Sequence, residues 1–367
     1  MASVAPNRSR ASSSDRDTDV GKSGSLTDLV EKCPVCLTKM EPWQEGMFDD
    51  RFGMPGLYDL VLCSTCGLVR TWPSLNDRDL SRIYGAYYPR ANIDLSALPL
   101  QAHKPSTRIG RIRIWLCGVG NQGHYATRPG MKVLDYGCGM GTSLFEVQAL
   151  GADAYGVEAD PTVKRVADYW GLKIHIGGLE ENPFPNTKFD LISLNQVIEH
   201  IPEPRRLLQL LRVRLEDEGI VVLSFPNLDS IYRRLFGRRW INWHVPYHIF
   251  HFNLKAFGLL CEHNGWKIAR WKTVTPNVWT MLQLKSLAAS STMGVANPLW
   301  SSIRMETGRG GAERTKFWFL NGLRRSARRA VRTVGIFLLY GVITVFNRVI
   351  DAAGYGDSLV VFIKPAR

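Results

Sequence analysis

The residues with the clearest chemical potential form a glycine-rich run behind a short apolar segment. The run reads Val-Leu-Asp-Tyr-Gly-Cys-Gly-Met-Gly-Thr and extends from Val133 to Thr142. Gly137 and Gly139 allow a tight turn and close approach of the backbone to a ligand, and Gly141 lets a following helix pack against the strand. A dinucleotide-binding run would carry its third glycine one residue later, where Thr142 stands, which argues against a nicotinamide or flavin cofactor.

Two carboxylates near this run suit a nucleotide ligand. Glu158 ends the next apolar segment, and a carboxylate there can accept hydrogen bonds from both hydroxyls of a ribose. Asp135 lies within the run, where its side chain can orient the glycine loop. The alternative is that both carboxylates only cap neighbouring helices.

Four cysteines form two Cys-x-x-Cys pairs near the N-terminus. Their spacing is typical of a tetrahedral zinc site, and four thiolates leave zinc no open position, so the site would be structural. A redox role would need only one pair beside a thioredoxin-like unit, and the pairs suit a reducing compartment better than a disulfide framework. The predicted ligands are Cys33, Cys36, Cys63 and Cys66.

Short apolar runs alternate with amphipathic segments after Gly130, which predicts a parallel sheet with helices between its strands. Ligands bind such sheets at the carboxyl ends of the strands. The loops at 195–200 and from Asn227 onward should therefore face a substrate. The predicted strands cover 133–134, 154–157, 173–176, 189–194, 220–225, 266–271 and 358–364, and the predicted helices cover 143–150, 161–170 and 254–264.

Together these motifs resemble the class I methyltransferases. The matching residues are Leu134–Gly141, Gly156-Val-Glu158, Phe189-Asp-Leu-Ile and the run from Val197 to Pro202. The resemblance implies a doubly wound, Rossmann-like α/β fold with a seven-stranded sheet whose last strand is antiparallel, and S-adenosylmethionine as the cofactor. In that family the glycine loop holds the amino-acid part of the cofactor and the residue at Glu158 holds its ribose. The residues expected at the cofactor are Asp135, Gly137, Cys138, Gly139, Gly141, Glu158 and Asn195.

The resemblance is greatest to the glycan- and small-molecule-modifying branch. Members of that branch often carry a Trp, Pro-x-His, Phe pattern, which here makes His248 the expected active-site base, with Tyr247 and Trp240 shaping the acceptor pocket. A metal site made of the three histidines of this segment is disfavoured, because Pro246 would interrupt a helix that aligns them.

Glu199 and His200 are the second catalytic candidates. The ubiquinone-type O-methyltransferases use a Glu-x-x-Glu-His run for a divalent metal, but Gln196 replaces the first carboxylate here. An amide is a poorer ligand for a hard cation, so metal-assisted catalysis is not expected. The alternative is that Glu199 and His200 only tie their loop to its surroundings.

The cysteine module, followed by Gly67-Leu-Val-Arg and the Tyr84–Tyr88 segment, resembles the zinc ribbon that precedes many sugar and cell-envelope methyltransferases. The N-terminus has no apolar core of signal-peptide length, so we expect a cytoplasmic protein. The expected organisation is a disordered tail at 1–28, the zinc ribbon at 29–73, a partly helical connector at 74–130, the methyltransferase domain at 131–280 plus 351–367, and a basic and apolar helical insertion at 281–350.

The net charge of +13 implies an acidic partner. Arginines recur at helical spacing between 324 and 332 and would form one cationic face. Directly after them come 14 uncharged residues, 333–346, about 21 Å of helix against about 30 Å of bilayer hydrocarbon. This stretch is too short to span, so 324–346 suggests either peripheral contact with an anionic membrane surface, at the inner face of the cytoplasmic membrane, or a helical lid over the sheet.

The function expected from these observations is methylation of a hydroxyl, or less favourably a carbon, of a sugar in a nucleotide-linked or lipid-linked glycan of the cell envelope. An RNA methyltransferase is the second reading, because some such enzymes also place a zinc finger before this domain and the charge is basic. The run Asn195-Gln-Val-Ile lacks the Asn-Pro-Pro-Tyr pattern of amino-group methylation of bases, so nucleic acid is not the expected partner. A third reading is a protein that binds the cofactor without turnover.

Overall fold

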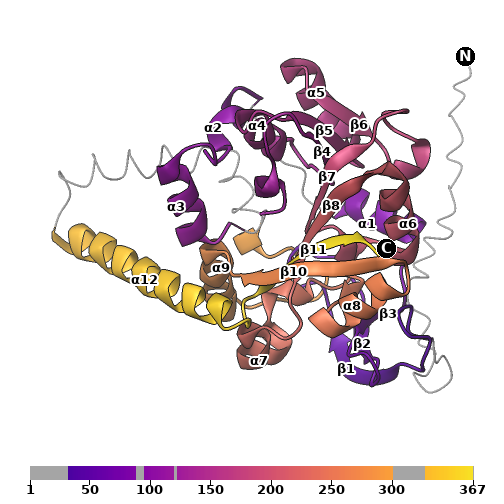
Figure 1. The fold of residues 1–367 in the computed structure, drawn as a ribbon. Coiled ribbons are helices and arrows are strands. Elements are labelled where there is room, and N and C mark those ends of the chain that lie inside the picture. Colours follow the sequence, from indigo (N-terminus) through magenta and orange to yellow (C-terminus); the bar gives the residue numbers. More distant parts are fainter. Residues whose placement is uncertain (1–31, 88–94, 120–121, 301–326, 367) are drawn as a thin grey trace, which may run out of the picture.

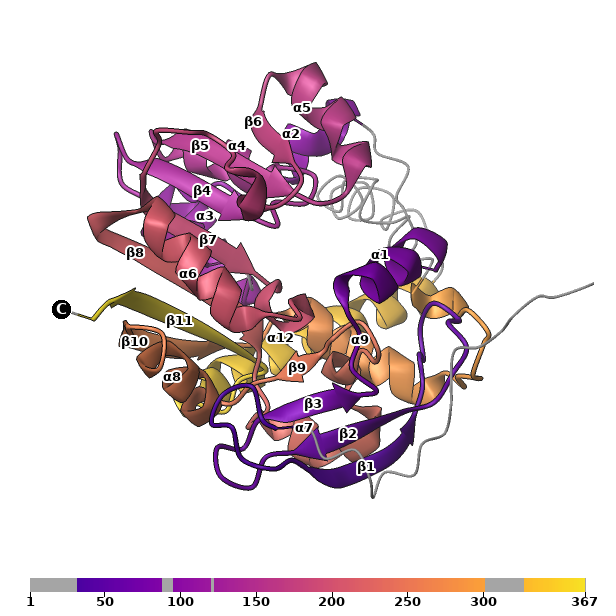
Figure 2. The ribbon, with the colours of Figure 1, turned by 90° about the vertical axis from the view of Figure 1, so that its right-hand side faces the viewer.

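The computed structural model describes residues 32–87, 95–119, 122–300 and 327–366. The predicted N-terminal tail lies outside these residues, as do Arg324 and Arg325 of the basic segment. Within the described chain, a large mixed sheet with helices on its faces lies beside a small antiparallel sheet, and both are visible in Figures 1 and 2.

The central sheet has seven strands in the order β10-β11-β8-β7-β4-β5-β6. The pairs from β8 through to β6 are parallel, whereas β11 runs antiparallel to both β8 and β10. This arrangement confirms the predicted doubly wound sheet with an antiparallel last strand. Its strands are β4 (Lys132–Tyr136), β5 (Asp153–Glu158), β6 (Lys173–Ile176), β7 (Phe189–Asn195), β8 (Leu215–Pro226), β10 (Trp266–Val274) and β11 (Ser358–Pro365).

The inner strands read as apolar runs because helices cover both faces of the sheet. Val133 and Leu134 are adjacent in β4 and face opposite sides, yet both are fully buried. The covering helices include α4 (Thr142–Ala149), α5 (Lys164–Trp170), α6 (Pro204–Arg214) and α8 (Leu254–Glu262). The helix predicted at 161–170 divides into a 3-10 turn, Pro161–Val163, and α5. The sequence analysis did not predict α6, although Pro204 begins it at a first-turn position.

The small sheet contains β1 (Glu41–Met47), β2 (Tyr58–Leu62), β3 (Val69–Trp72) and β9 (Phe250–His251), in that order. All three pairings are antiparallel. Its fourth strand therefore comes from a segment far along the chain, after β8 (Figure 2). The module also shares a hydrophobic core with the large sheet, because Cys33 and Leu68 belong to the same buried cluster as Phe225.

Helices α1 (Asp77–Ala86), α2 (Leu98–Gln101) and α3 (Arg108–Cys117) connect the two sheets. After β8 come α7 (Ile231–Phe236) and, after β10, α9 (Asn277–Ala288) and α12 (Ala327–Ala352). Helix α12 extends away from the body of the molecule beside α3 (Figure 1).

Helix α12 continues past the uncharged stretch 333–346 and contains an 18-residue window, Gly335–Ala352, with mean hydropathy 1.5. By length and composition alone, that window is sufficient to cross a membrane. The sequence count stopped at Asn347 and Arg348, whose side chains are paired with the protein.

Candidate cofactor and acceptor site

The glycine loop leaves β4 in a conformation that requires glycine. Gly137 has φ of +78°, and a Cβ at this position would lie 2.5 Å from Cγ2 of Val197. The amides of Gly137 and Cys138 both donate to the carbonyl of Val157, at 2.8 and 3.1 Å. These bonds turn the chain sharply between the ends of β4 and β5.

Gly139 lies at the open side of the loop. Its φ is +54°, and a Cβ at this position would have no atom within 4 Å, so this part of the backbone is open to a ligand. Its amide donates to Oε2 of Glu158 at 2.8 Å, while Oε1 of Glu158 accepts from the amide of Asp160 at 3.0 Å. The carboxylate at the end of β5 is thereby held against the loop and keeps lone pairs for the hydroxyls of a ribose.

Asp135 lies beneath the loop rather than in its opening. It is 2% exposed and accepts hydrogen bonds from the hydroxyls of Ser143 and of Ser193, the latter at 2.6 Å. Burial raises the pKa of Asp135. It ties β4 to α4 and β7, which agrees with an orienting role. Burial also raises the pKa of the Cys138 thiol, so this side chain favours the neutral thiol form. Asn195, at the end of β7, accepts from the hydroxyl of Ser224.

A buried polar group that sequence reasoning missed fastens the preceding chain to α4. Nε2 of His124 lies 2.7 Å from Oε2 of Glu146, and the Tyr125 hydroxyl donates to the same oxygen at 2.6 Å. Burial alone would raise the pKa of Glu146, but the hydrogen bonds from His124 and Tyr125 lower it. No local sequence pattern predicts this contact, because His124 and Tyr125 are distant from Glu146 in the sequence and meet it only in the folded chain.

The catalytic candidates Glu199, His200 and His248 do come together. The rings of His200 and His248 have centroids 4.7 Å apart. Nδ1 of His200 lies 2.8 Å from the Tyr247 carbonyl, and Nδ1 of His248 lies 2.8 Å from the Asn242 carbonyl. A carbonyl only accepts, so each Nδ1 carries the proton and each Nε2 keeps its lone pair.

Desolvation sets the charge state of this cluster. Burial lowers the pKa of His200 to about 4 and that of His248 well below its usual value. Burial also raises the pKa of Glu199 to about 8, and neither of its carboxylate oxygens has a hydrogen-bond partner among the described residues. All three groups therefore favour their neutral forms near pH 7.

The ligand atoms of Glu199, His200 and His248 lie within 4.8 Å of one another, so the cluster could also hold a cation. Gln196, which replaces the carboxylate of the ubiquinone-type run, takes no part in it. Its Nε2 donates to the Ser358 hydroxyl at 3.2 Å.

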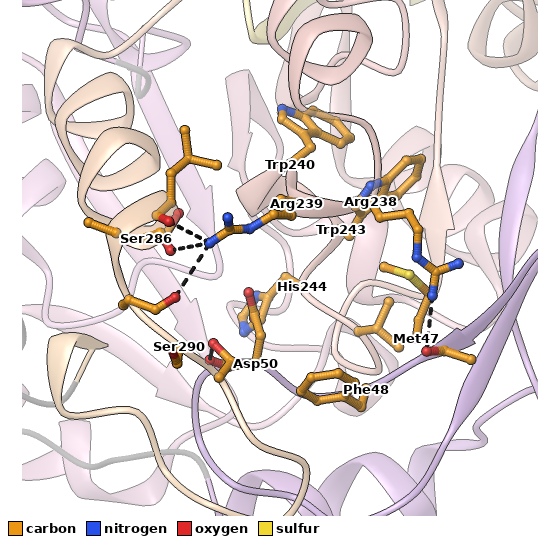
Figure 3. Close-up of a pocket in the computed structure, with 16 residues that line it drawn as sticks. Met47, Phe48, Asp50, Arg238, Arg239, Trp240, Trp243, His244, Ser286 and Ser290 are labelled. Atoms are coloured by element: carbon orange, nitrogen blue, oxygen red, sulfur yellow. Dashed lines mark hydrogen bonds between the residues drawn. The ribbon is translucent and has the colours of Figure 1, made fainter.

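A pocket of about 510 Å³ adjoins this cluster (Figure 3). Its wall comes from three segments, within 46–50, 238–245 and 286–291, and it includes Asp50, Arg239 and three serines. Arg239 also donates to the carbonyls of Ser286 and Leu287 at 2.9 and 2.8 Å. The predicted pocket residue Trp240 lines this cavity, whereas Tyr247 is not among the lining residues and stacks on His244 with ring centroids 4.9 Å apart.

His244 is the histidine of the pocket wall, and sequence analysis did not single it out. Its ring centroid lies 4.9 Å from that of His248 and 6.4 Å from that of His200. It has φ of +38°, which is rare for a residue other than glycine and common at functional sites. His248, the predicted base, is not among the residues that line this pocket, but its ring contacts that of His244, which is.

The four cysteines of the N-terminal module also gather. Their sulfur atoms lie within 4.8 Å of one another, with Cys33 to Cys66 at 3.6 Å and Cys36 to Cys63 at 3.3 Å. A tetrahedral zinc ion with bonds of about 2.3 Å would set its sulfurs about 3.8 Å apart. A hydrogen bond from the Cys66 thiol lowers the pKa of Cys33 to about 5. The donor set and its spacing thus fit a zinc ion.

Comparison with known proteins gives a family for the central part of the chain. Residues 121–270 match a family described as a methyltransferase domain. This region contains β4 to β8, the glycine loop, Glu158 and the histidine cluster. Residues 121–270 are therefore a methyltransferase domain.

Two of the curated proteins similar to this chain are also named as methyltransferases. The mitochondrial ubiquinone biosynthesis O-methyltransferase of Schizosaccharomyces pombe is 33% identical over 118 residues, which are 30% of this chain and 41% of that protein. The ubiquinone biosynthesis O-methyltransferase of Cereibacter sphaeroides is 31% identical over 125 residues, which are 32% of this chain and 51% of that protein. The chain thus spans about half the length of the curated relatives it matches.

Among solved structures, coclaurine N-methyltransferase bound to N-methylheliamine and SAH is similar to this chain with a TM-score of 0.44 and 13% sequence identity. The match covers 77% of this chain and 82% of that one.

The open space at Gly139 yields a prediction. Gly139→Ala should weaken S-adenosylmethionine binding by about tenfold or more, because the methyl group would occupy the place of the ligand, a loss of about 1.4 kcal/mol per factor of ten. The measurement is a calorimetric titration with S-adenosylmethionine. Gly130→Ala is the matched control, since Gly130 also has positive φ and open space but lies before β4. Equal cofactor affinity in both variants would contradict the assignment of the loop.

Proposed function

We propose, on the premise that residues 121–270 are a methyltransferase domain, that the protein methylates an oxygen, or less favourably a carbon, of a sugar in a nucleotide- or lipid-linked glycan. One observation carries the proposal. The loop after β7 leads directly from Asn195, beside the cofactor loop, to a cluster of neutral histidines that adjoins a polar pocket. The loop after β7 thus connects the glycine loop to the histidine cluster, and His244 connects that cluster to the pocket.

The proposed reaction is an in-line displacement, for which alignment of the reacting atoms supplies much of the rate enhancement. Bound S-adenosylmethionine would supply an electrophilic methyl group, held by the loop at Gly137–Gly141 and by Glu158. The acceptor hydroxyl forms the new bond to carbon as the carbon–sulfur bond breaks. Its proton goes to a base, and Nε2 of His248, whose Nδ1 donates to the Asn242 carbonyl, keeps a lone pair that can receive it.

The lining of the pocket supports a sugar acceptor. Asp50 and the serine hydroxyls offer hydrogen bonds, and Trp240 and Trp243 offer aromatic surface. Arg238 and Arg239 add positive charge, which suits the phosphate that links a sugar to a nucleotide or a lipid. The names of the relatives, which are O-methyltransferases, support oxygen as the methylated atom.

The acceptor class is tested by supplying purified protein and labelled S-adenosylmethionine with nucleotide sugars, membrane lipid-linked glycans and total RNA in separate reactions. We expect label in one of the two glycan fractions. Label in RNA alone would replace the proposal with an RNA methyltransferase. Cofactor binding without label in any fraction would favour a protein that binds the cofactor silently.

The base is tested by comparing His248→Asn with His244→Asn. Loss of the base should lower kcat by about 100-fold or more while cofactor affinity is retained. Because burial lowers the pKa of His248, its ring remains unprotonated as the pH falls through 6.5, so kcat/KM of the wild type should stay level between about pH 6 and 7. Unchanged turnover in His248→Asn, with a large loss in His244→Asn, would assign the base to the histidine of the pocket wall.

Zinc belongs to the same proposal, as a structural ion held by Cys33, Cys36, Cys63 and Cys66. Three of the four cysteines are fully buried, and the amide of Val35 points to Sγ of Cys33 at 3.4 Å. Such sites contribute about 10–16 kcal/mol of apparent binding free energy to folding at neutral pH. The ion would hold the small sheet and would not touch the reacting atoms.

Removal of zinc with a chelator should therefore lower the melting temperature and expose the segment around Cys33–Cys66 to protease. Cys33→Ser should reproduce the effect, whereas Cys117→Ser, outside the cluster, should not. Metal analysis should find one zinc per chain. Unchanged melting and proteolysis after the cysteines have been shown to be free of metal would refute the zinc assignment.

A further inference from the structure

Helix α12 exposes two apolar turns on every side. All eight residues from Gly335 to Val342 are exposed in the described chain. Seven of them are glycines or have purely apolar side chains, and only the Tyr340 side chain contains a polar atom. The exposed fractions of Phe337, Leu338 and Val342 are 57%, 67% and 67%. Successive helical residues point about 100° apart, so Ile336–Leu339 present apolar surface around the whole circumference. A helix that only packed on the sheet as a lid would bury one of these faces.

Helix α3 extends this apolar surface. Ile109, Ile112 and Leu116, which share one face by their spacing, are 81%, 57% and 40% exposed, and Trp115 is 59% exposed. The two helices are in contact, because the Tyr340 hydroxyl donates to the Cys117 sulfur at 3.7 Å and Arg348 donates to the carbonyls that end α3. Figure 1 shows α3 and α12 together at one end of the molecule.

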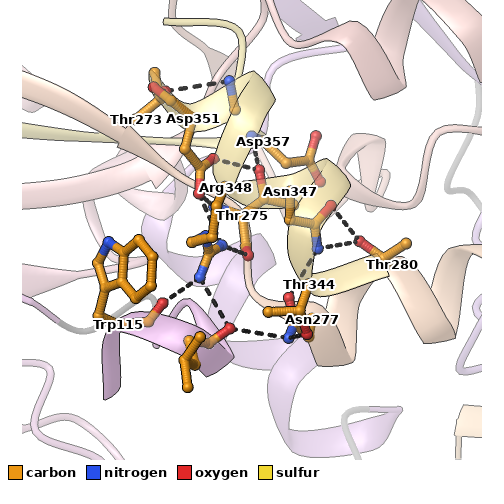
Figure 4. Close-up of polar contacts among 12 residues, drawn as sticks. Trp115, Thr273, Thr275, Asn277, Thr280, Thr344, Asn347, Arg348, Asp351 and Asp357 are labelled. Atoms are coloured by element: carbon orange, nitrogen blue, oxygen red, sulfur yellow. Dashed lines mark hydrogen bonds and ion pairs between the residues drawn. The ribbon is translucent and has the colours of Figure 1, made fainter. Parts of the chain in front are cut away.

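The other end of α12 is fixed firmly to the protein (Figure 4). Nδ2 of Asn347 donates to Asn277 and to Thr280, both at 3.0 Å. Arg348 pairs with Asp351 at 2.7 Å, and Asp351 accepts from the Thr275 hydroxyl at 2.7 Å. Asn347, Arg348 and Asp351 of the 18-residue apolar window thus bond to the rest of the protein, and the exposed residues Gly335–Val342 precede this anchored part.

Basic residues occur in both helices that carry the exposed apolar residues. Helix α3 contains Arg108, Arg111 and Arg113 and no acidic residue, and the sequence at the start of α12 contains Arg328, Arg329 and Arg332 with no acidic residue in the first turn. Basic residues beside exposed apolar residues are the pattern of helices that lie in the interface of anionic membranes. The aromatic side chains Trp115 and Tyr340, both partly exposed, are of the kind found at that depth.

We propose that α3 and the exposed part of α12 form a membrane-docking surface that lies in the interfacial region of an anionic lipid bilayer. The proposal goes beyond the methyl-transfer reaction and does not depend on it. A bilayer is favoured over a partner helix or a second copy of the chain because the apolar surface of α12 has no single face for one partner. The helix should not cross the bilayer, because only the part before Asn347 is free and about 21 Å of helix does not span about 30 Å of hydrocarbon.

The experiment is co-sedimentation of the full chain with phosphatidylcholine vesicles, with and without phosphatidylglycerol. The wild type should bind the anionic vesicles and lose affinity as salt is raised. The variant Ile112→Asp/Leu338→Asp should bind them about tenfold more weakly or worse, since a tenfold loss corresponds to only about 1.4 kcal/mol. The matched control is Tyr169→Asp/Val213→Asp, which places the same charges at side chains 58% and 64% exposed on α5 and α6; it should bind as the wild type does.

Three results would overturn the proposal: no binding of the wild type to anionic vesicles, equal binding by the two double variants, or resistance of bound protein to extraction by alkaline carbonate, which would indicate a spanning helix. Sedimentation velocity on the same samples reveals a second copy as the occupant if the wild type self-associates and Ile112→Asp/Leu338→Asp does not. Calorimetry with S-adenosylmethionine should give the same affinity for all variants. Failure of docking is thereby distinguished from failure of the proposed methyltransferase function.

Discussion

The placement of the histidine cluster depends on the short segment just before β9, which is hydrogen-bonded to β3 on one side and to the loop after β7 on the other. The Thr71 amide of β3 donates to the Ile249 carbonyl at 2.9 Å, and the Thr71 hydroxyl donates to the His248 carbonyl at 2.7 Å. On the other side, the Ile249 amide donates to the Glu199 carbonyl at 2.8 Å. The cysteine module therefore does more than precede the methyltransferase domain. It holds the backbone of the proposed base against the loop that leaves β7.

The same burial that fixes these side chains also determines their protonation. His200 has a pKa of about 4 in the fold, below the value of an exposed histidine, so its contribution to stability is lost as the pH falls below about 6.5. Glu199 has a pKa of about 8, above that of an exposed glutamate, so its contribution is lost as the pH rises toward 8. Between these limits the cluster is neutral. Neutral imidazoles in a dry site can accept a proton, whereas imidazolium could not.

Much of the fold was predictable because its signals are local. Apolar runs predicted all seven strands of the large sheet, and two short cysteine motifs predicted one cluster of sulfurs. The missed features all join distant residues. Strand β9 has only two residues and becomes a strand through β3. Glu146 meets His124 through the fold, and His244 differs from His248 in lining the pocket. The surroundings of Arg348 are equally non-local, since in the sequence it follows an uncharged run, whereas in the fold it pairs with Asp351 and donates to the Thr275 carbonyl.

A continuous set of hydrogen bonds joins the two ends of the molecule that the proposals concern. Asp351 of α12 accepts from the Thr275 hydroxyl, which in turn accepts from the Asp357 amide at 2.9 Å. The Asp357 carboxylate, whose pKa burial raises to about 6, accepts from Nε1 of Trp240 and from Nδ2 of Asn242, both at 2.8 Å.

Trp240 lines the pocket, and the carbonyl of Asn242 accepts from Nδ1 of His248. One set of hydrogen bonds thus connects the C-terminal part of α12, the pocket wall and His248, the candidate catalytic base. Such a set of bonds would hold the pocket at a constant height above a membrane on which α3 and α12 rested. An acceptor attached to lipid needs a site at a fixed distance from the bilayer, whereas a soluble nucleotide sugar does not. If α3 and α12 dock on a membrane as proposed, this connection suits a lipid-linked acceptor better than a soluble nucleotide sugar.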